Sequence, residues 1–225
     1  MIICHGLTGH KDELHLTTLA DSLQSYGVAS VRFDFNGHGE YDTPFSQHTL
    51  AKEMDDLQVI FDYVSSLPWV DTGRIGLTGH SQGGAVAGMK AGELGADKVK
   101  CLALLSPAAC IHTYALQNTF LGFDLPKFEE MPDSISFVKG LSLNKEYFRV
   151  AREMDIHALT APYSGPVCLL QGDADMPTLY TDALRYKDYL PQMEMFIREG
   201  YDHCYTSNVS EALVPAIHFL VDNLK

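Results

Sequence analysis

The chain has 225 residues, 46% of them hydrophobic and 20% charged, which is enough apolar material for one globular domain with its own core. Its 16 Lys and Arg against 29 Asp and Glu give a formal net charge of −13, which repels phosphate backbones and anionic lipid surfaces. We therefore expect neither nucleic acid nor a membrane as a partner. The oligomeric state is left open, a homodimer included.

The five cysteines are odd in number, scattered and mostly set in apolar runs, a pattern typical of buried free thiols in a reducing compartment. They lack the close Cys/His spacing of a zinc site, so we expect no metal. The sequence has no apolar run of membrane-helix length and no basic-then-apolar leader, which predicts a cytoplasmic protein. Residues 1–6 already have the character of a core strand, so an upstream start, with a signal inside it, stays an open alternative.

Short apolar runs bounded by Gly, Pro or Asp predict buried strands. They run from Val28 to Phe35, Arg74 to Thr78, Val99 to Leu105, Pro166 to Leu170 and Met195 to Arg198. Apolar residues at helical spacing predict helices between and after them. These run from Leu16 to Gly27, Leu50 to about Pro68, Gln82 onward, about Leu179 to Leu190, and Val209 to Leu224. The alternation predicts an α/β fold: a parallel sheet with helices on both faces and ligand chemistry at the carboxyl ends of the strands.

One stretch, from about 107 to 162, is too long for an ordinary connection between strands. We expect a single domain over residues 1–225, with this stretch inserted as a lid over the edge of the sheet. Aromatic residues are mixed with acidic ones there, and they either line a substrate pocket or pack the insertion against the body. They are Tyr114, Phe120, Phe123, Phe128, Phe137, Tyr147 and Phe148.

Residues 74–85, RIGLTGHSQGGA, read as an apolar strand that runs into G-x-S-x-G and then into a helix. Serine is a weak nucleophile, so the chain must lift it out on a sharp turn, and glycines on either side keep Cβ atoms away from the bend. Gly79 and Gly83 occupy those positions. With a strand before it and a helix after it, the motif predicts that Ser81 is a catalytic nucleophile.

A serine nucleophile needs an imidazole base, and the base needs a carboxylate that fixes its tautomer. His203 is placed late, in the loop after the last predicted strand, and is the predicted base. The turn after the strand at 166–170 carries two carboxylates, Asp173 and Asp175, which composition does not separate. The order serine, acid, histidine is the one that G-x-S-x-G hydrolases use.

The negative oxygen of a tetrahedral intermediate needs preorganised donors, normally the N–H after the nucleophile and one from a loop after an early strand. Gln82 supplies the first donor. The loop at 3–9, ICHGLTG, supplies the second, through the N–H of Leu7. His5 in that loop and His80 beside the serine are interpreted as structural hydrogen-bonding residues rather than as second bases.

Six segments occur in order: HGLTGHKDE, SVRFDFNGHGE, LTGHSQGGAVAG, LLSPAA, PVCLLQGDAD and EGYDHCY. With them the chain resembles the bacterial cinnamoyl (feruloyl) esterases of the α/β-hydrolase superfamily, over nearly its whole length. The resemblance implies an α/β-hydrolase fold and hydrolysis of hydroxycinnamate esters, small-molecule substrates, without a metal or cofactor, through Ser81, Asp175 and His203. The spacing from Gly172 in the family pattern selects Asp175 as the acid. The resemblance also implies that the insertion is a lid carrying the phenolic ring site.

The chain departs from those relatives in two places. Relatives carry a pair of strands before the HG loop, and the acid is followed here by Met176-Pro177-Thr178 rather than by small β-branched residues. Two alternatives to the feruloyl esterase interpretation stay open. One is a general short-chain carboxylesterase or monoacylglycerol-type lipase, and the other is a non-catalytic binding protein on the same fold.

Overall fold

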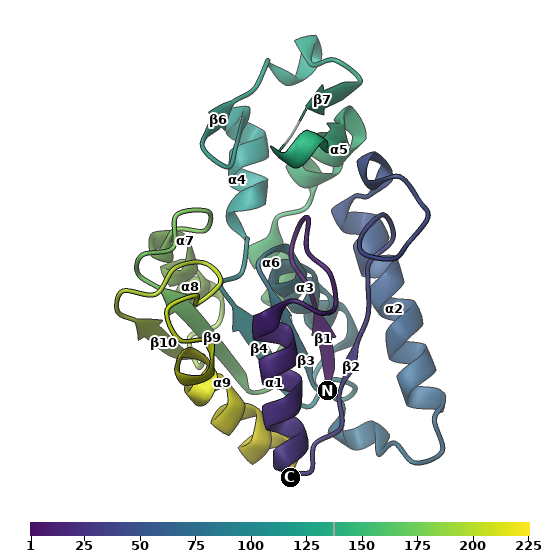
Figure 1. Ribbon diagram of the computed structural model, residues 1–225, viewed down its shortest axis with the longest axis vertical. Helices are drawn as coiled ribbons and strands as arrows, with labels where there is room; N and C mark the ends of the chain where they lie inside the picture. Colours follow the sequence, from purple (N-terminus) through teal and green to yellow (C-terminus); the bar gives the residue numbers. More distant parts are fainter. Residues whose placement is uncertain (137) are drawn as a thin grey trace.

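The computed structural model describes residues 1–136 and 138–225. Within them, a six-stranded sheet in the order β10-β9-β4-β3-β1-β2 forms the centre of the molecule (Figure 1). Its strands are β1 (Ile2–Cys4), β2 (Val31–Arg32), β3 (Leu77–His80), β4 (Leu102–Leu105), β9 (Val167–Gly172) and β10 (Glu194–Arg198). Every neighbouring pair is parallel, which confirms the predicted sheet.

Helices cover both faces of this sheet (Figure 1). Those of the body are α1 (Leu14–Ser25), α2 (Leu50–Ser66), α3 (Gln82–Leu94), α6 (Ile156–Thr160), α7 (Tyr180–Leu184), α8 (Tyr186–Tyr189) and α9 (Val209–Leu224). Helices α1 and α9 pack together on one face, and α2, α3 and α6 form the layer on the other. None of the helices in the described residues is both long and apolar enough to cross a membrane.

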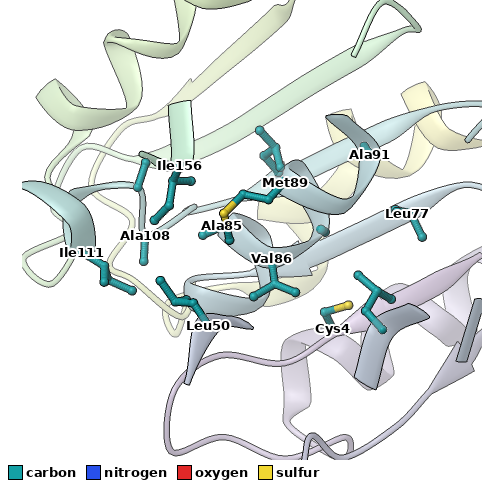
Figure 2. Packing of buried hydrophobic residues seen from close by; sticks show 14 of the residues in the cluster. Cys4, Leu50, Leu77, Ala85, Val86, Met89, Ala91, Ala108, Ile111 and Ile156 are labelled. Atoms are coloured by element: carbon teal, nitrogen blue, oxygen red, sulfur yellow. The ribbon is translucent and has the colours of Figure 1, made fainter. Parts of the chain in front are cut away.

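The core consists of two apolar layers that the central strands separate. Successive strand residues face opposite sides, so Ile2 and Cys4 join the layer of α2 and α3, whereas Ile3 joins that of α1 and α9. Figure 2 shows Val86 and Met89 of α3 within the first layer. Because both faces are covered, the central strands are apolar at nearly every position, which is why they are readable as continuous runs.

The predicted strand from Val28 to Phe35 is shortened to β2. It is an edge strand, paired with β1 alone, so only one side of it has a ladder. Beyond β2 the backbone turns to other partners: the Phe35 N–H donates to His5 Nε2 at 3.0 Å. The strand at Arg74–Thr78 is likewise shifted to β3, because residues Thr72–Arg74 form a short 3₁₀ helix capped by the Asp71 side chain.

The predicted helix from Leu179 to Leu190 is two short helices, α7 and α8, which meet at Arg185. The Arg185 N–H donates to the Asp182 carbonyl, and the Asp188 N–H donates to the Arg185 carbonyl, at 3.2 and 3.1 Å. These bonds span three residues rather than four, a tighter winding that interrupts the α-helix. The remaining predicted strands and helices are present, with ends shifted by a few residues.

The stretch at 107–162 begins after β4 and rises above the carboxyl ends of the strands (Figure 1). It contains α4 (Cys110–Gln117), the hairpins β5 (Thr119–Phe120) with β6 (Phe123–Asp124) and β7 (Ser134–Ser136) with β8 (Ser142–Asn144), α5 (Lys145–Glu153), and 3₁₀ helices at Phe128–Glu130 and Val138–Gly140. Its last element, α6, returns to the body and packs on α3. A Cβ on Gly92 would lie 2.0 Å from the Leu159 carbonyl oxygen, which shows how closely the two helices approach.

Three of the aromatic residues of this stretch pack inward. Phe120, Tyr147 and Phe148 are buried and meet edge to face, with ring centroids 5.6, 5.6 and 5.4 Å apart. Phe123 is exposed, and Phe137 lies outside the described residues. The first three therefore hold the insertion together and fix it to the core.

Candidate active site

Ser81 lies between β3 and α3, with φ 56° and ψ −123°. A non-glycine residue in this region is strained, and such strain persists only where surrounding contacts impose it. Here the Ser81 N–H donates to the Leu105 carbonyl at 2.9 Å, and the N–H groups of Ala85 and Ala108 donate to the Ser81 carbonyl at 3.1 and 2.9 Å. The turn is thus tied to β4 and to the segment that leads into the insertion.

Close backbone packing requires the two glycines of the motif. A Cβ on Gly79 would lie 2.2 Å from the Gly83 carbonyl oxygen, and a Cβ on Gly83 would lie 2.2 Å from the His5 carbonyl oxygen. The atoms that would have to move are backbone atoms of the turn and of the loop after β1. The motif therefore sets the contact between the serine turn and that loop.

Replacing Gly83 with alanine should destabilise the fold by about 3 kcal/mol, because neither backbone segment can yield without disturbing the sheet. The control is Gly73→Ala, in the exposed 3₁₀ helix at Thr72–Arg74, where a Cβ would meet only the exposed Asp71 Oδ1, at 3.3 Å. That change should cost less than about 1 kcal/mol. Urea unfolding measures both values, and a Gly83→Ala cost no larger than that of Gly73→Ala would refute the packing argument.

The acid and the predicted base are in direct contact. His203 Nδ1 lies 2.8 Å from Asp175 Oδ2 and 3.2 Å from Thr178 Oγ1. Asp175 is buried, and its carboxylate also accepts hydrogen bonds from Gln171 Nε2, the Thr178 N–H and the Thr178 hydroxyl at 2.8, 2.9 and 2.8 Å. Since the carboxylate only accepts, the proton between the pair sits on Nδ1 and leaves Nε2 of His203 free to take another.

The second carboxylate of the turn has a different neighbour. Asp173 is exposed and accepts a hydrogen bond from the Gly200 N–H at 2.6 Å. It ties the turn after β9 to the turn after β10 and makes no contact with the imidazole of His203. The structure therefore places Asp175, rather than Asp173, beside the histidine.

His80 links the serine turn to the histidine loop. Its buried ring donates from Nε2 to the His203 carbonyl at 2.7 Å, and the two rings lie 4.5 Å apart between centroids. Burial holds the pKa of His80 well below its ordinary value, so the ring is neutral. Across the described residues no hydrogen bond joins Ser81 to His203, as is common in active sites without substrate.

The ring of His15, on α1, lies against that of His80, with centroids 4.2 Å apart and planes at 60°, and burial lowers the pKa of His15 from 6.5 to about 4. In the unfolded chain it titrates near 6.5, so only the unfolded state gains the proton between pH 6.5 and 4. The stability due to neutral His15 is thus present above pH 6.5 and is lost as the pH falls towards 4. We expect His15→Leu to reduce the stability lost between pH 7.5 and 5.5 by about 1 kcal/mol. Urea unfolding at both pH values tests this, and an unchanged pH dependence would contradict it.

The two predicted oxyanion donors belong to segments that meet at Ser81. A Cβ on Gly6 would come within 2.9 Å of Ser81 Cβ, so the loop that carries Leu7 passes directly against the serine. Gln82 is the first residue of α3, where backbone N–H groups lack helical partners. In residues 1–136 and 138–225, neither the Leu7 nor the Gln82 N–H donates a hydrogen bond. His5 has the structural role expected for it, donating from Nδ1 to the Gly6 carbonyl at 2.8 Å.

Several supporting residues were not predicted from the sequence. The Gln82 side chain donates to Glu53 Oε1 and accepts from the Tyr147 hydroxyl, both at 2.7 Å. Thr178 braces both Asp175 and His203. A threonine three residues after the acid was a readable signal, because that spacing suits a side-chain-capped turn. Glu53 and Tyr147 reach the site only through the tertiary fold.

Known proteins resemble this chain in both sequence and fold. The family model described as "Serine aminopeptidase, S33" matches residues 1–132, more than half of the chain. The chain belongs to this family. The S33 match includes the loop after β1 and the whole serine turn.

Three relatives of this S33 chain match different shares of its length and of their own. Est1E from Butyrivibrio proteoclasticus, solved with ferulic acid, is 31% identical over 99% of this chain and 88% of its own, with a TM-score of 0.94. The mitochondrial palmitoyl-protein thioesterase ABHD10 of Mus musculus is 26% identical over 235 residues, 100% of this chain and 75% of that protein. An uncharacterized 31.7 kDa Escherichia coli protein from the traX-finO intergenic region is 30% identical over 102 residues, 45% of this chain and only 35% of that relative. The likeness to Est1E confirms the α/β-hydrolase fold and the resemblance seen in the sequence.

Proposed function

We propose that the chain is a serine esterase of carboxylic esters, with hydroxycinnamate (ferulate-type) esters as its substrates. The observation that carries the proposal is the strained Ser81 at the turn into α3, together with the contact between the buried Asp175 and the partly buried His203, whose carbonyl accepts a hydrogen bond from His80. The choice of acyl group is supported by the likeness to Est1E, whose structure contains ferulic acid.

In the proposed reaction, His203 Nε2 takes the proton from Ser81 Oγ as the oxygen attacks the ester carbonyl. The N–H groups of Leu7 and Gln82 hold the resulting oxyanion. His203 then protonates the departing alcohol, and water repeats the sequence on the acyl-enzyme to release the acid. Asp175 keeps the imidazole oriented and stabilises its charged form in both halves.

The insertion is proposed to act as the lid of this site. It stands over the carboxyl ends of the strands, where ligands bind in parallel α/β sheets (Figure 1). Its buried aromatic cluster packs it as an ordered layer rather than a loose loop. The partly buried Tyr114 and Phe128 are candidates for contact with a phenolic ring.

A second candidate keeps the same residues and changes the acyl group. The match to ABHD10, a palmitoyl-protein thioesterase, runs along the whole of this chain and favours a long-chain acyl thioester. A general short-chain carboxylesterase or a monoacylglycerol-type lipase is the remaining alternative. All of them use the acyl-enzyme route described above.

Initial rates on methyl ferulate, p-nitrophenyl butyrate and a palmitoyl thioester separate these functions. We expect kcat/KM for methyl ferulate to equal or exceed that for the butyrate ester. Hydrolysis of the butyrate alone would replace the proposal with a general esterase, and a preference for the thioester would favour the second candidate. If no ester, thioester or aminoacyl anilide is turned over, the chain is a binding protein on a hydrolase fold.

A further inference from the structure

Next to the loop after β1, where His5 contacts His38, lies a buried group of three side chains that the proposed reaction does not use. His38 is in the loop after β2, His48 follows the 3₁₀ helix at Phe45–Gln47, and Glu53 is in the first turn of α2. They are 4%, 2% and 2% exposed. One ligand atom from each lies within 4.8 Å of the other two.

The atoms that face each other in this group all have lone pairs. His38 Nδ1 donates to the Asn36 carbonyl at 3.3 Å, and His48 Nδ1 donates to the Phe45 carbonyl at 2.6 Å. Since each Nδ1 carries the proton that it donates, the Nε2 of each ring is the atom left facing the group. These two nitrogens and Glu53 Oε2 are buried and make no hydrogen bond in the described residues. Burying three such atoms together is unfavourable unless a proton on Glu53, whose pKa burial raises to about 8, or a cation lies between them.

We propose that His38 Nε2, His48 Nε2 and Glu53 Oε2 bind one divalent transition-metal ion, of which Zn²⁺ is the best fit. Two imidazoles and one carboxylate are a zinc donor set, and nitrogen ligands disfavour Mg²⁺ and Ca²⁺. Nδ1–H donation to a backbone carbonyl is also the usual way of orienting a metal-binding histidine. Tetrahedral ligands at zinc distances lie about 3.4 Å apart, so the ion would draw the three atoms inward.

One of the three side chains also borders the surface. A cavity of about 320 Å³ has His48 in its wall, together with Asp55, Asp56 and Lys52. The two carboxylates outnumber the one ammonium group there, which favours the approach of a cation, as does the net charge of −13.

The ion would link parts of the fold, with a water as its fourth ligand. Glu53 uses its other oxygen, Oε1, to accept from Gln82 Nε2 at 2.7 Å. An ion at Oε2 would thus tie the loop at 36–48 to α2 and, through Gln82, to the start of α3. The inference does not depend on which ester is cleaved, and its test measures metal rather than turnover, so the two proposals fail separately.

The test begins with the full chain treated with a chelator and then titrated with Zn²⁺ by calorimetry. We expect one ion per chain and, at about 100 times the dissociation constant, a rise in Tm of about 5 °C or more. Co²⁺ should give the visible absorption of a nitrogen and oxygen site. An absence of stoichiometric binding, or a thiolate charge-transfer band that assigns the ion to cysteines, would overturn the proposal.

Variants locate the ion. His48→Leu should weaken Zn²⁺ binding by at least about 100-fold, since loss of a mere outer-shell partner already costs about 10–100-fold. Glu53→Gln keeps the side-chain size and an acceptor for Gln82, and is the second variant if His48→Leu does not fold. His157→Leu is the control, because His157 is also buried with an unpartnered Nε2 but lies on α6. Equal affinity in wild type, His48→Leu and Glu53→Gln would refute the site.

Discussion

Ser81→Ala is expected to lower kcat for methyl ferulate by about 10⁵-fold or more while the fold stays intact. The change removes the attacking oxygen. It adds no new strain, because serine already occupies the position with φ 56° and alanine meets the same backbone penalty. Stopped assays at high enzyme concentration measure the residual rate, and urea unfolding checks that stability changes by less than about 1 kcal/mol.

Ser106→Ala is the matched control for that prediction. Ser106 follows β4, is fully buried, has φ 43°, and bonds the Tyr205 hydroxyl at 2.9 Å. It shares with Ser81 its residue type, its burial and its unusual backbone, but the proposed chemistry gives it no role. Its variant should keep most of the activity. Retention of activity in Ser81→Ala, or equal loss in both variants, would remove Ser81 from the reaction.

Asp175→Asn is expected to lower kcat by about 10⁴-fold, the second largest effect. The amide can present its NH₂ group to His203 Nδ1 and so stabilise the wrong tautomer, and it cannot stabilise the imidazolium. Asp173→Asn, in the same turn, should leave kcat within about twofold, because Asp173 bonds the Gly200 N–H instead. Initial rates across substrate concentrations separate kcat from KM. A larger loss in the Asp173 variant would reverse the assignment of the acid.

Much of the fold was predictable because both faces of the sheet are covered. Strands buried on two sides are continuous apolar runs, and helices on the faces of the sheet have apolar residues at helical spacing. For this reason β4, β9, α2 and α9 can be recognised from the sequence alone. The edge strand β2 and the helix broken at Arg185 were not, because their limits depend on pairing and on local hydrogen bonds.

The candidate site divides in the same way. Ser81 has a local sequence motif, because its turn needs glycines at fixed positions. His203 is identified by its position after the acid, in the loop that follows the last predicted strand. Choosing between Asp173 and Asp175 required the resemblance to a known family, since both lie in one turn and differ only in where they point. The hydrogen bonds that hold the Gln82 side chain have no local sequence pattern, because the tertiary fold alone brings their partners together. The same is true of the group of His38, His48 and Glu53.

Covalent labelling shows whether Ser81 is an activated nucleophile. A fluorophosphonate forms a bond only with a serine whose oxygen a neighbouring base has activated. Mass spectrometry of the labelled and digested protein should show one adduct per chain, on the peptide that contains Ser81. The adduct should be absent in Ser81→Ala and should form much more slowly in Asp175→Asn. An unlabelled Ser81, or an adduct on another residue of a protein that still hydrolyses esters, would contradict the account.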